Sequence, residues 1–481
     1  MATVILLPIV ASLVLAGAST LMRRSGPLQS LPMIEAFVIL GSGVALCVST
    51  LDGATPTALG GMLRVDALSA FMLAVIGLVA VVATWAGFTS RNPIGRDWTF
   101  AMLLVLFMGA LALVVLADNL GIAWVALEAT TIATALLVGH KPNRQSLEAA
   151  WKYVILGSVG IAIAFLGILA LYAATLAAGS PTLSWVALHD QALPLNATLL
   201  AVAAGLAVLG FATKSGIAPM HTWVPDAYSQ APASVTGLMS GVASAAAFYV
   251  ILRIQAIVNP ILGPGLLRGM LLIGGLLSLL VAGLLIWQQR DIKRMLAYSS
   301  IEHLGLLAVA AGIGGPVAIA AALLHILGHG LVKSSTFVVT GRIAFAEGTT
   351  KLADIRGLLT RRPALAIPYL AGMAALLGFP PFSLFFSEVA IIIAGVARGF
   401  GWVMAVVVLF LLFLFAGLVR HITRMAFGAN PPDAEIHPDH DSYGPRLPIA
   451  IALGLTAIIA FLSGPFSDLL ARAAQVLEVH P

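Results

Sequence analysis

The sequence contains little charge and almost no cysteine. Lys, Arg, Asp and Glu together account for 9% of the 481 residues, and Cys47 is the only cysteine. A single cysteine excludes a disulfide framework and a cysteine-ligated cluster within the chain. Residues 312–315 (Gly-Ile-Gly-Gly) lack the strand–helix context that a nucleotide-binding loop needs. We therefore expect no redox centre and no cofactor in this chain.

Hydrophobic residues make up 60% of the chain, and its mean hydropathy is +1.04. This composition predicts an all-α integral membrane protein, because a helix needs about 20 mostly apolar residues to cross a bilayer. By that length we count about fourteen spans. They cover residues 3–21, 32–50, 67–89, 98–117, 119–138, 149–177, 197–216, 232–258, 266–287, 294–312, 316–341, 366–396, 402–426 and 447–463. Several runs are longer than a span requires, which allows tilt or an internal break.

The basic residues are distributed unevenly between the loops. If the N-terminus lies outside, 17 of the 25 Lys and Arg residues fall on the inside and 5 on the outside. The other three, Lys152, Lys214 and Lys333, fall within spans. The positive-inside rule therefore predicts an even number of spans, with both termini on the outer (periplasmic) side of a cell inner membrane.

Residues 210–225 combine a lysine with an interrupted helix. Lys214 follows a long apolar run, and Gly216 and Pro219 interrupt the helix directly after it. An ammonium at membrane depth costs at least about 2.5–3.5 kcal/mol. Irregular backbone is tolerated there only inside protein or beside water. The stretch therefore predicts an ion-handling site, and the alternative is a lysine that extends to the headgroups at the membrane surface.

Other titratable groups also lie within or next to the predicted spans. His325, His329 and Lys333 recur every four residues, which places them on one helix face. The further candidates are Glu128, Lys152, His221, Lys293, Glu302, His303 and Glu388. Each could be neutralised in a structural pair. For a set of acids, lysines and histidines on several spans, an ion or proton pathway is the better interpretation.

Two predicted helix breaks divide the chain. The first follows Lys214, and the second lies at Pro380 and Pro381, just before Glu388. They are five spans apart, and an odd offset reverses the orientation of the two units, as in inverted repeats. The predicted division is three N-terminal spans (1–97), a first five-helix repeat (98–258), an inverted second repeat (259–427), and an inside loop with the last span and a tail (428–481).

The longest polar stretch, residues 427–446, contains histidines and several acids. A His/Asp cluster can bind a metal ion. Its prolines and its lack of helical spacing favour a flexible inside loop instead. We predict no metal site.

Together these motifs resemble the antiporter-like, proton-conducting membrane subunits shared by respiratory complex I, multisubunit cation/proton antiporters and membrane-bound hydrogenases. The resemblance covers the chain up to about residue 465. It rests on residues 124–131, 210–227, 291–300, 325–333 and 380–388. Residues 127–131, 149–152 and 299–303 are most similar to component F of hydrogenase-4, which belongs to group-4 nickel-iron hydrogenases of the formate hydrogenlyase kind.

The resemblance implies roles for the buried groups. Glu128 and Lys214 would form an input-side pair, with Lys152 as an additional lysine near Glu128. A central axis would then run through Lys293, His325, His329 and Lys333 to a terminal group, Glu388.

Two features depart from the family pattern. Glu388 stands where some relatives use lysine. The eighth span, residues 234–253, has no lysine or histidine in its centre, so water or His221 would have to bridge the two halves of the axis.

The predicted function is proton translocation, with exchange for sodium left open, in a membrane subunit of a respiratory oxidoreductase complex of the hydrogenase-4 type. Other membrane subunits and soluble nickel-iron and iron–sulfur subunits would be its partners. The alternatives are a subunit of a complex I-type NADH-quinone oxidoreductase, a cation/proton antiporter, a quinone-reducing site at His221 and Tyr228, and a structural anchor. No nucleic-acid partner is expected, because the basic residues are spread over loops.

Overall fold

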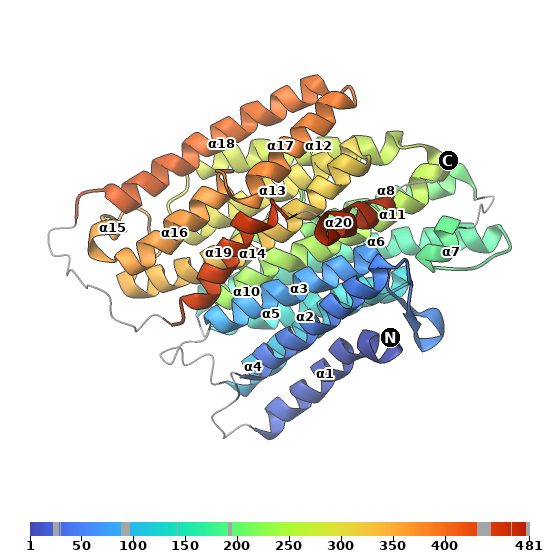
Figure 1. The fold of residues 1–481 in the computed structure, drawn as a ribbon, viewed down its shortest axis with the longest axis horizontal. Coiled ribbons are helices and arrows are strands. Elements are labelled where there is room, and N and C mark those ends of the chain that lie inside the picture. Colours follow the sequence, from blue (N-terminus) through green and yellow to red (C-terminus); the bar gives the residue numbers. More distant parts are fainter. Residues whose placement is uncertain are drawn as a thin grey trace.

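A computed structural model describes residues 1–22, 28, 30–87, 97–141, 143–190, 195–430, 444–462 and 464–477. In this part of the chain nearly all residues are helical, and the long helices lie side by side in a bundle (Figure 1). The only strands in the described ranges form a small antiparallel hairpin between α2 and α3. In it β1 (Thr57–Ala58) pairs with β2 (Leu63–Arg64) across the 3-10 turn η2 (Leu59–Gly61).

The helices follow one another with short connections. They are α1 (Ala2–Leu21), α2 (Ser30–Leu51), α3 (Ala67–Gly87), α4 (Trp98–Leu116), α5 (Leu120–Val138), α6 (Arg144–Ala177), α7 (Trp185–Asp190), α8 (Ala197–Ser215), α9 (Trp223–Gln230), α10 (Ala233–Leu238), the π-helix η4 (Met239–Ala243), α11 (Ser244–Leu262), α12 (Gly265–Ile286), α13 (Ile292–Ile313), α14 (Pro316–Glu347), α15 (Leu358–Arg361), α16 (Pro363–Leu376), α17 (Ser383–Ala397), α18 (Gly401–Phe427), α19 (Leu447–Ile459) and α20 (Pro465–Gln475).

Twelve described helices are long and apolar enough to cross a membrane, with α10, η4 and α11 counted as one. The pair α16 and α17 and the shorter helix α19 occupy the two remaining predicted spans. The prediction of a polytopic helical membrane protein is therefore confirmed. The short helices α7, α9, α15 and α20 were not expected, because their apolar runs are too short to register as spans.

Polar side chains set where several helices begin. Asp97, Asn119, Asn143, Asn196 and Asp291 each accept a hydrogen bond from a backbone N–H in the first turn of the following helix. Such caps satisfy donors that have no partner within the helix. They explain why α4, α5, α6, α8 and α13 begin where they do.

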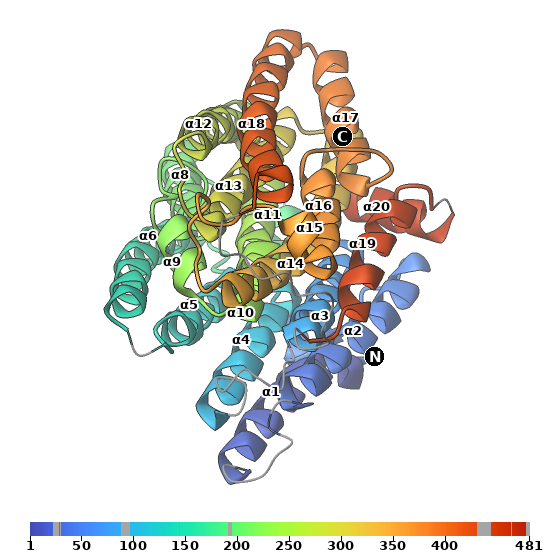
Figure 2. The same cartoon turned by 90° about the vertical axis from the view of Figure 1, so that its left-hand side faces the viewer.

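The helices differ in how much protein surrounds them. The span Ala233–Leu262 and helix α13 are fully buried over their most apolar 18 residues, whereas only 28% of that window is buried in α1 and 33% in α18. Figure 2 shows α11, α13 and α14 in the middle of the bundle, with α1, α6 and α18 at its margins. Polar groups on the central helices are therefore shielded from lipid by the outer helices.

Both predicted helix breaks are confirmed. Helix α8 ends at Ser215, and Gly216 has a left-handed conformation (φ 89°) that a residue with a side chain rarely adopts. A turn then leads to α9. The second break separates α16 from α17, with Gly378 at φ 67°. The division into two repeats stays a prediction, and most of the polar stretch 427–446 lies outside the described residues.

Helix α8, which carries Lys214, packs very closely on α6. A Cβ atom at Gly210 would overlap backbone atoms of Gly160 and Ala164 on α6, whereas Gly205 on the same helix faces open space. Only glycine permits this approach of two backbones, which is a common way to join membrane helices.

We expect Gly210→Ala to lower thermal stability, because overpacking by one methyl group typically costs about 1–3 kcal/mol. Gly205→Ala is the matched control and should be neutral or stabilising. Unfolding can be followed by the reaction of a fluorescent maleimide with Cys47, which is buried in the folded chain. Equal melting temperatures for the two variants would contradict the close packing.

Candidate functional site

Lys214 is buried at the end of α8 and bonds to hydroxyl groups. Its Nζ donates to Thr131 Oγ1 on α5 at 2.8 Å and to Tyr153 OH on α6 at 2.7 Å. Only 3% of Lys214 is exposed, so the side chain does not extend to the membrane surface. The alternative of a lysine among the headgroups is therefore wrong.

Glu128 lies one turn before Thr131 on α5, yet no direct ion pair joins it to Lys214 among the described residues. Its Oε1 accepts a hydrogen bond from Ser158 Oγ on α6 at 3.1 Å, and its Oε2 is buried without a partner. The two groups lie near each other on the wall formed by α5 and α6 without a described direct contact, so their pairing stays a prediction. Glu128 accepts from Ser158, and Lys214 donates to Thr131 and Tyr153.

Lys152 and His221 lie away from this pair. Lys152 Nζ contacts Glu148 at 2.7 Å and Asp226 at 3.3 Å, and about half of its side chain is exposed. It lies six residues, about 9 Å along the helix axis, from the serine that bonds Glu128. His221 lies in the turn between α8 and α9, where its Nδ1 is buried without a hydrogen-bond partner. Neither residue contacts Lys214 within the described ranges.

Three predicted residues of the second half meet around a histidine pair. His303 Nδ1 on α13 lies 3.1 Å from His325 Nε2 on α14, and the ring of His303 lies 5.0 Å from that of His329. All three imidazoles are at most 2% exposed. The spacing on α14 therefore brings histidines to one face, as predicted, and α13 supplies a third one that faces them.

The hydrogen bonds around this pair form one chain, whose direction depends on the tautomers of the two rings. When Ser387 Oγ on α17 donates to the carbonyl of Leu384, it accepts from His325 Nδ1 at 2.9 Å. His325 Nε2 then carries the lone pair and accepts from the Nδ1–H of His303. In this tautomer His303 Nε2, which has no hydrogen-bond partner among the described residues, is an open acceptor.

Glu388 completes the cluster on α17. One ligand atom each from His303, His325 and Glu388 lie within 4.8 Å of one another. Two imidazoles and a carboxylate at that distance could hold a metal ion, or they could exchange a proton over the length of one water molecule. The hydrogen bond to Ser387 and the direct His303–His325 contact agree with the second use.

Lys333 and Glu302 lie at the side of the cluster that faces the first half. Lys333 Nζ donates to the carbonyl of Leu296 at 2.9 Å and forms a short hydrogen bond with Ser299 Oγ, both on α13. Lys333 is fully buried, and Glu302 Oε2 is buried without a partner among the described residues. Like Lys214, Lys333 bonds to neutral oxygen atoms and has no carboxylate partner in the part of the chain that the structure describes.

Hydroxyl groups occupy the span that has no lysine or histidine. In the π-helix η4, Ser240 Oγ lies 2.8 Å from Ser300 Oγ on α13. Ser300 donates to the carbonyl of Leu296, which Lys333 also uses. One helical turn further, Ser244 Oγ lies 3.0 Å from Tyr228 OH on α9. The three serines were missed at the sequence level, because a buried serine in an apolar run has no recognisable spacing, and Tyr228 was considered only as part of a quinone site.

Lys293 lies in the first turn of α13, at the basic end of the bundle. It is 6% exposed, and its Nζ is 3.4 Å from the carbonyl of Ala231. The described residues show no contact between Lys293 and the histidine cluster. Lys293 therefore lies at the basic end of the predicted axis and not between its other members.

A second buried charge cluster lies near the opposite end of the bundle. Arg253 on α11 is one of the five basic residues that the sequence count places on the outside, yet it is only 2% exposed. Its Nη2 donates to Asp66 Oδ1 at 2.8 Å and to Ser69 Oγ at 3.0 Å, and its guanidinium lies 3.9 Å from the centre of the Trp185 ring. This ion pair joins α3, α7 and α11. Arg253 therefore lies within a buried helix and not in an outside loop, which corrects the prediction.

A helical membrane bundle with two broken helices and a buried set of acids, lysines and histidines defines an antiporter-like, ion-handling membrane subunit. Residues 117–414 match the family model described as NADH:quinone oxidoreductase/Mrp antiporter, TM. The chain belongs to this family.

Individual relatives agree with this assignment. The hydrogenase-4 component F homolog of Methylacidiphilum infernorum is 37% identical over 317 residues, which cover 65% of this chain and 66% of that relative. Subunit N of the NADH-quinone oxidoreductase of Deinococcus radiodurans is 30% identical, with 94% of this chain and 92% of the relative covered. A chain of an archaeal respiratory membrane complex, the membrane-bound sulfane sulfur reductase, superposes with a TM-score of 0.89 at 25% identity, covering 99% and 98%.

We expect Asp66→Asn to destabilise the fold by about 3–5 kcal/mol, because it leaves the buried Arg253 charge uncompensated. Asp52→Asn, at an exposed acid, serves as the control. Equilibrium unfolding followed by tryptophan fluorescence measures the difference. Similar unfolding midpoints for both variants would show that Arg253 finds its compensation elsewhere.

Proposed function

We propose that the chain conducts protons along its buried row of titratable groups as a membrane subunit of a multisubunit oxidoreductase of the hydrogenase-4 and formate hydrogenlyase kind. The observation that carries this proposal is the placement of Lys214, the hydroxyls of η4 and α13, Lys333 and the histidine cluster within one shielded layer of helices. Intramembrane ionisable groups in such a layer usually serve ion or proton movement.

The input step uses the neighbours of Lys214. Its ammonium bonds to Thr131, one helical turn from Glu128, so a rotation of the flexible lysine stem exchanges a hydroxyl partner for the carboxylate. Formation of that ion pair favours the charged lysine, and its separation favours proton release. The Glu128–Lys214 pair is therefore a site whose proton affinity depends on a small movement.

The transfer between halves passes through hydroxyls and water. A serine or tyrosine hydroxyl accepts one proton on one lone pair and releases its own on the other side, so it relays a proton without a stable charge. Ser244, Ser240 and Ser300 are placed for this role between Tyr228 and Lys333, and water would carry the proton from Ser300 to Lys333, because the Leu296 carbonyl to which both donate has no proton to pass on. This path removes the need for a lysine in the eighth span.

The exit step uses the histidine pair and Glu388. With His303 as the donor to His325, a proton that arrives at the open Nε2 of His303 forms an imidazolium, which passes its Nδ1 proton to Nε2 of His325. The His325 imidazolium then releases a proton through one water molecule. Glu388 lies close enough to receive it. Because Glu388 stands where some relatives have a lysine, the charge of this terminal group is lower by one unit in each protonation state.

The chain itself would carry no cofactor. Metal centres would belong to soluble nickel-iron and iron–sulfur subunits, with further membrane subunits beside this one. The similarity to a hydrogenase-4 component F homolog supports this assembly. A subunit of a complex I-type enzyme is the second candidate, supported by the 30% identity to an NADH-quinone oxidoreductase subunit N over most of both chains. An inner-membrane location with both termini outside is part of the proposal.

The structure argues against a quinone site at Tyr228. Its side chain is fully buried, its hydroxyl bonds to Ser244, and the ring of Phe337 packs edge-on against it. A quinone headgroup would have to displace these contacts.

We expect Lys214→Ala and Glu128→Gln each to abolish proton pumping by the assembled complex, while the soluble subunits retain electron transfer. Glu35→Gln is the matched control, because Glu35 is a fully buried carboxyl group on α2 outside the row. Proton uptake into vesicles, measured with a pH-sensitive dye, tests this. Undiminished pumping in both variants would refute the proposal.

We expect the double variant Ser240→Ala and Ser300→Ala to slow proton transfer at least about tenfold, which corresponds to about 1.4 kcal/mol in the barrier. Ser335→Ala is the control, because that buried hydroxyl bonds only to the carbonyl of Leu331 in its own helix. Pumping rates at a fixed electron-transfer rate give the comparison. A double variant that pumps as fast as the control would mean that protons take another route.

A further inference from the structure

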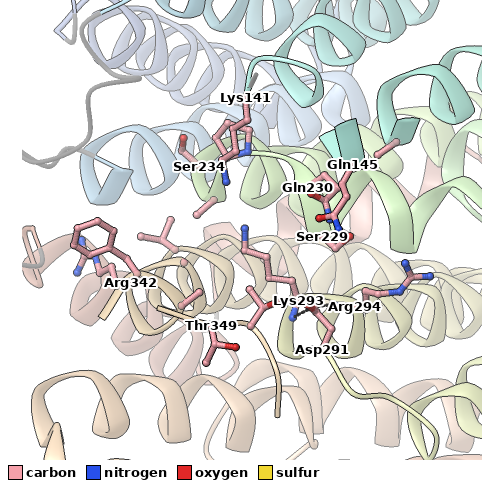
Figure 3. A pocket seen from close by; sticks show the side chains of 18 of the residues that line it. Lys141, Gln145, Ser229, Gln230, Ser234, Asp291, Lys293, Arg294, Arg342 and Thr349 are labelled. Carbon is pink, nitrogen blue, oxygen red and sulfur yellow. Dashed lines mark hydrogen bonds between the residues drawn. The ribbon is translucent and has the colours of Figure 1, made fainter. Parts of the chain in front are cut away.

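A large cavity lined by described residues is separate from the histidine cluster. It has a volume of about 1000 Å³ and lies among α6, α9, α13 and α14, at the basic end of the bundle (Figure 3). Its described lining contains three acids, Glu148, Asp226 and Asp291. The six basic residues of the lining are Lys141, Lys152, Lys293, Arg294, Arg342 and Lys351. The cavity therefore carries an excess of positive charge.

The three carboxylates that line the cavity already have partners within the chain. Asp226 pairs with Lys152 at 3.3 Å and with Arg294 at 2.6 Å, and Glu148 pairs with Lys152 at 2.7 Å. Asp291 Oδ1 accepts from two backbone N–H groups at the start of α13. No carboxylate in the described ranges pairs with the four remaining basic side chains.

Lys141 and Lys293 face each other across the cavity (Figure 3). Like charges that line one cavity repel each other. Lys293 is 94% buried, and the only described polar contact of its Nζ is the 3.4 Å approach to the carbonyl of Ala231. Burial lowers the pKa of Lys141, which lies in the loop before α6. An anion between the two ammonium groups would relieve the repulsion that the fold leaves uncompensated.

Apolar side chains beside the cavity point to the membrane as the source of that anion. Trp151, next to Lys152, and Phe345, in the cavity wall, are each 66% exposed, and Leu147 is 53% exposed. Exposed aromatic residues at the end of membrane helices sit at the headgroup level. Acyl chains can therefore lie against these side chains while a headgroup enters the cavity.

We propose that this cavity binds the phosphate headgroup of an anionic phospholipid, held between Lys141, Lys293 and Lys351. Basic pockets between membrane helices are suited to such headgroups. The lipid would join α6, α13 and α14 at the basic face of the bundle. This inference does not depend on proton conduction.

The test uses the full chain in nanodiscs of phosphatidylcholine with a minor fraction of phosphatidylglycerol, followed by native mass spectrometry of the released protein. We expect the wild-type chain to retain one phosphatidylglycerol. The double variant Lys141→Gln and Lys351→Gln should weaken retention about thirtyfold. The double variant Lys141→Arg and Lys351→Arg should keep the lipid, because the charges remain.

Arg398→Gln with Arg472→Gln is the control, since neither arginine is in the described lining of the cavity and both are among the five basic residues counted on the outside; it should retain the lipid like the wild type. Thermal unfolding of each variant confirms that it is folded. Equal retention by the wild type and the glutamine variant would overturn the proposal, as would no preference for phosphatidylglycerol over phosphatidylcholine. Displacement of the lipid by millimolar inorganic phosphate would overturn the assignment to a membrane lipid. Because binding is the readout, a failure here is distinct from a failure of proton pumping.

Discussion

Charged groups that are shielded from both water and lipid must find their polar partners within the bundle. In this chain the partners differ from one group to the next, and the difference separates two kinds of buried charge. Lys214 and Lys333 bond to hydroxyls and a carbonyl, while Glu128 and Glu302 each keep a buried oxygen without a partner. An acid and a lysine held near each other without a fixed ion pair remain able to exchange protons.

The pair of Arg253 and Asp66 shows the opposite arrangement. The carboxylate receives the guanidinium and the backbone N–H of Ser69, and the ring of Trp185 covers the arginine. Arginine does not release its proton in proteins, so this pair is permanently charged and holds three helices together. Burial therefore produces a permanent ion pair between Arg253 and Asp66, and elsewhere in the bundle a row of groups that can exchange protons.

The central helices make the row possible because they face protein along their whole length. The serines Ser240 in η4, Ser244 in α11, and Ser299 and Ser300 in α13 are all buried, whereas on an outer helix they would have to face away from lipid. The π-helix η4 lies in this layer, and π-bulges are frequent at functional sites because they change the direction of side chains. Here it places Ser240 beside Ser300. At the basic end of the bundle this layer of helices borders the cavity. There Lys141 and Lys293 face each other, and no carboxylate in the described ranges pairs with either lysine.

The sequence by itself determined the class of the protein, the helical spans and the two breaks, because apolar run length and the positions of Gly216 and Pro380 act locally. It also determined that His325, His329 and Lys333 share a face, since four-residue spacing is a property of one helix. Only the tertiary structure decided which groups meet, because contacts between helices depend on how each helix is rotated. It brought Ser387 to His325, Tyr153 to Lys214 and Ser240 to Ser300. It also moved Lys152 to the rim of a cavity and buried Arg253 against Asp66.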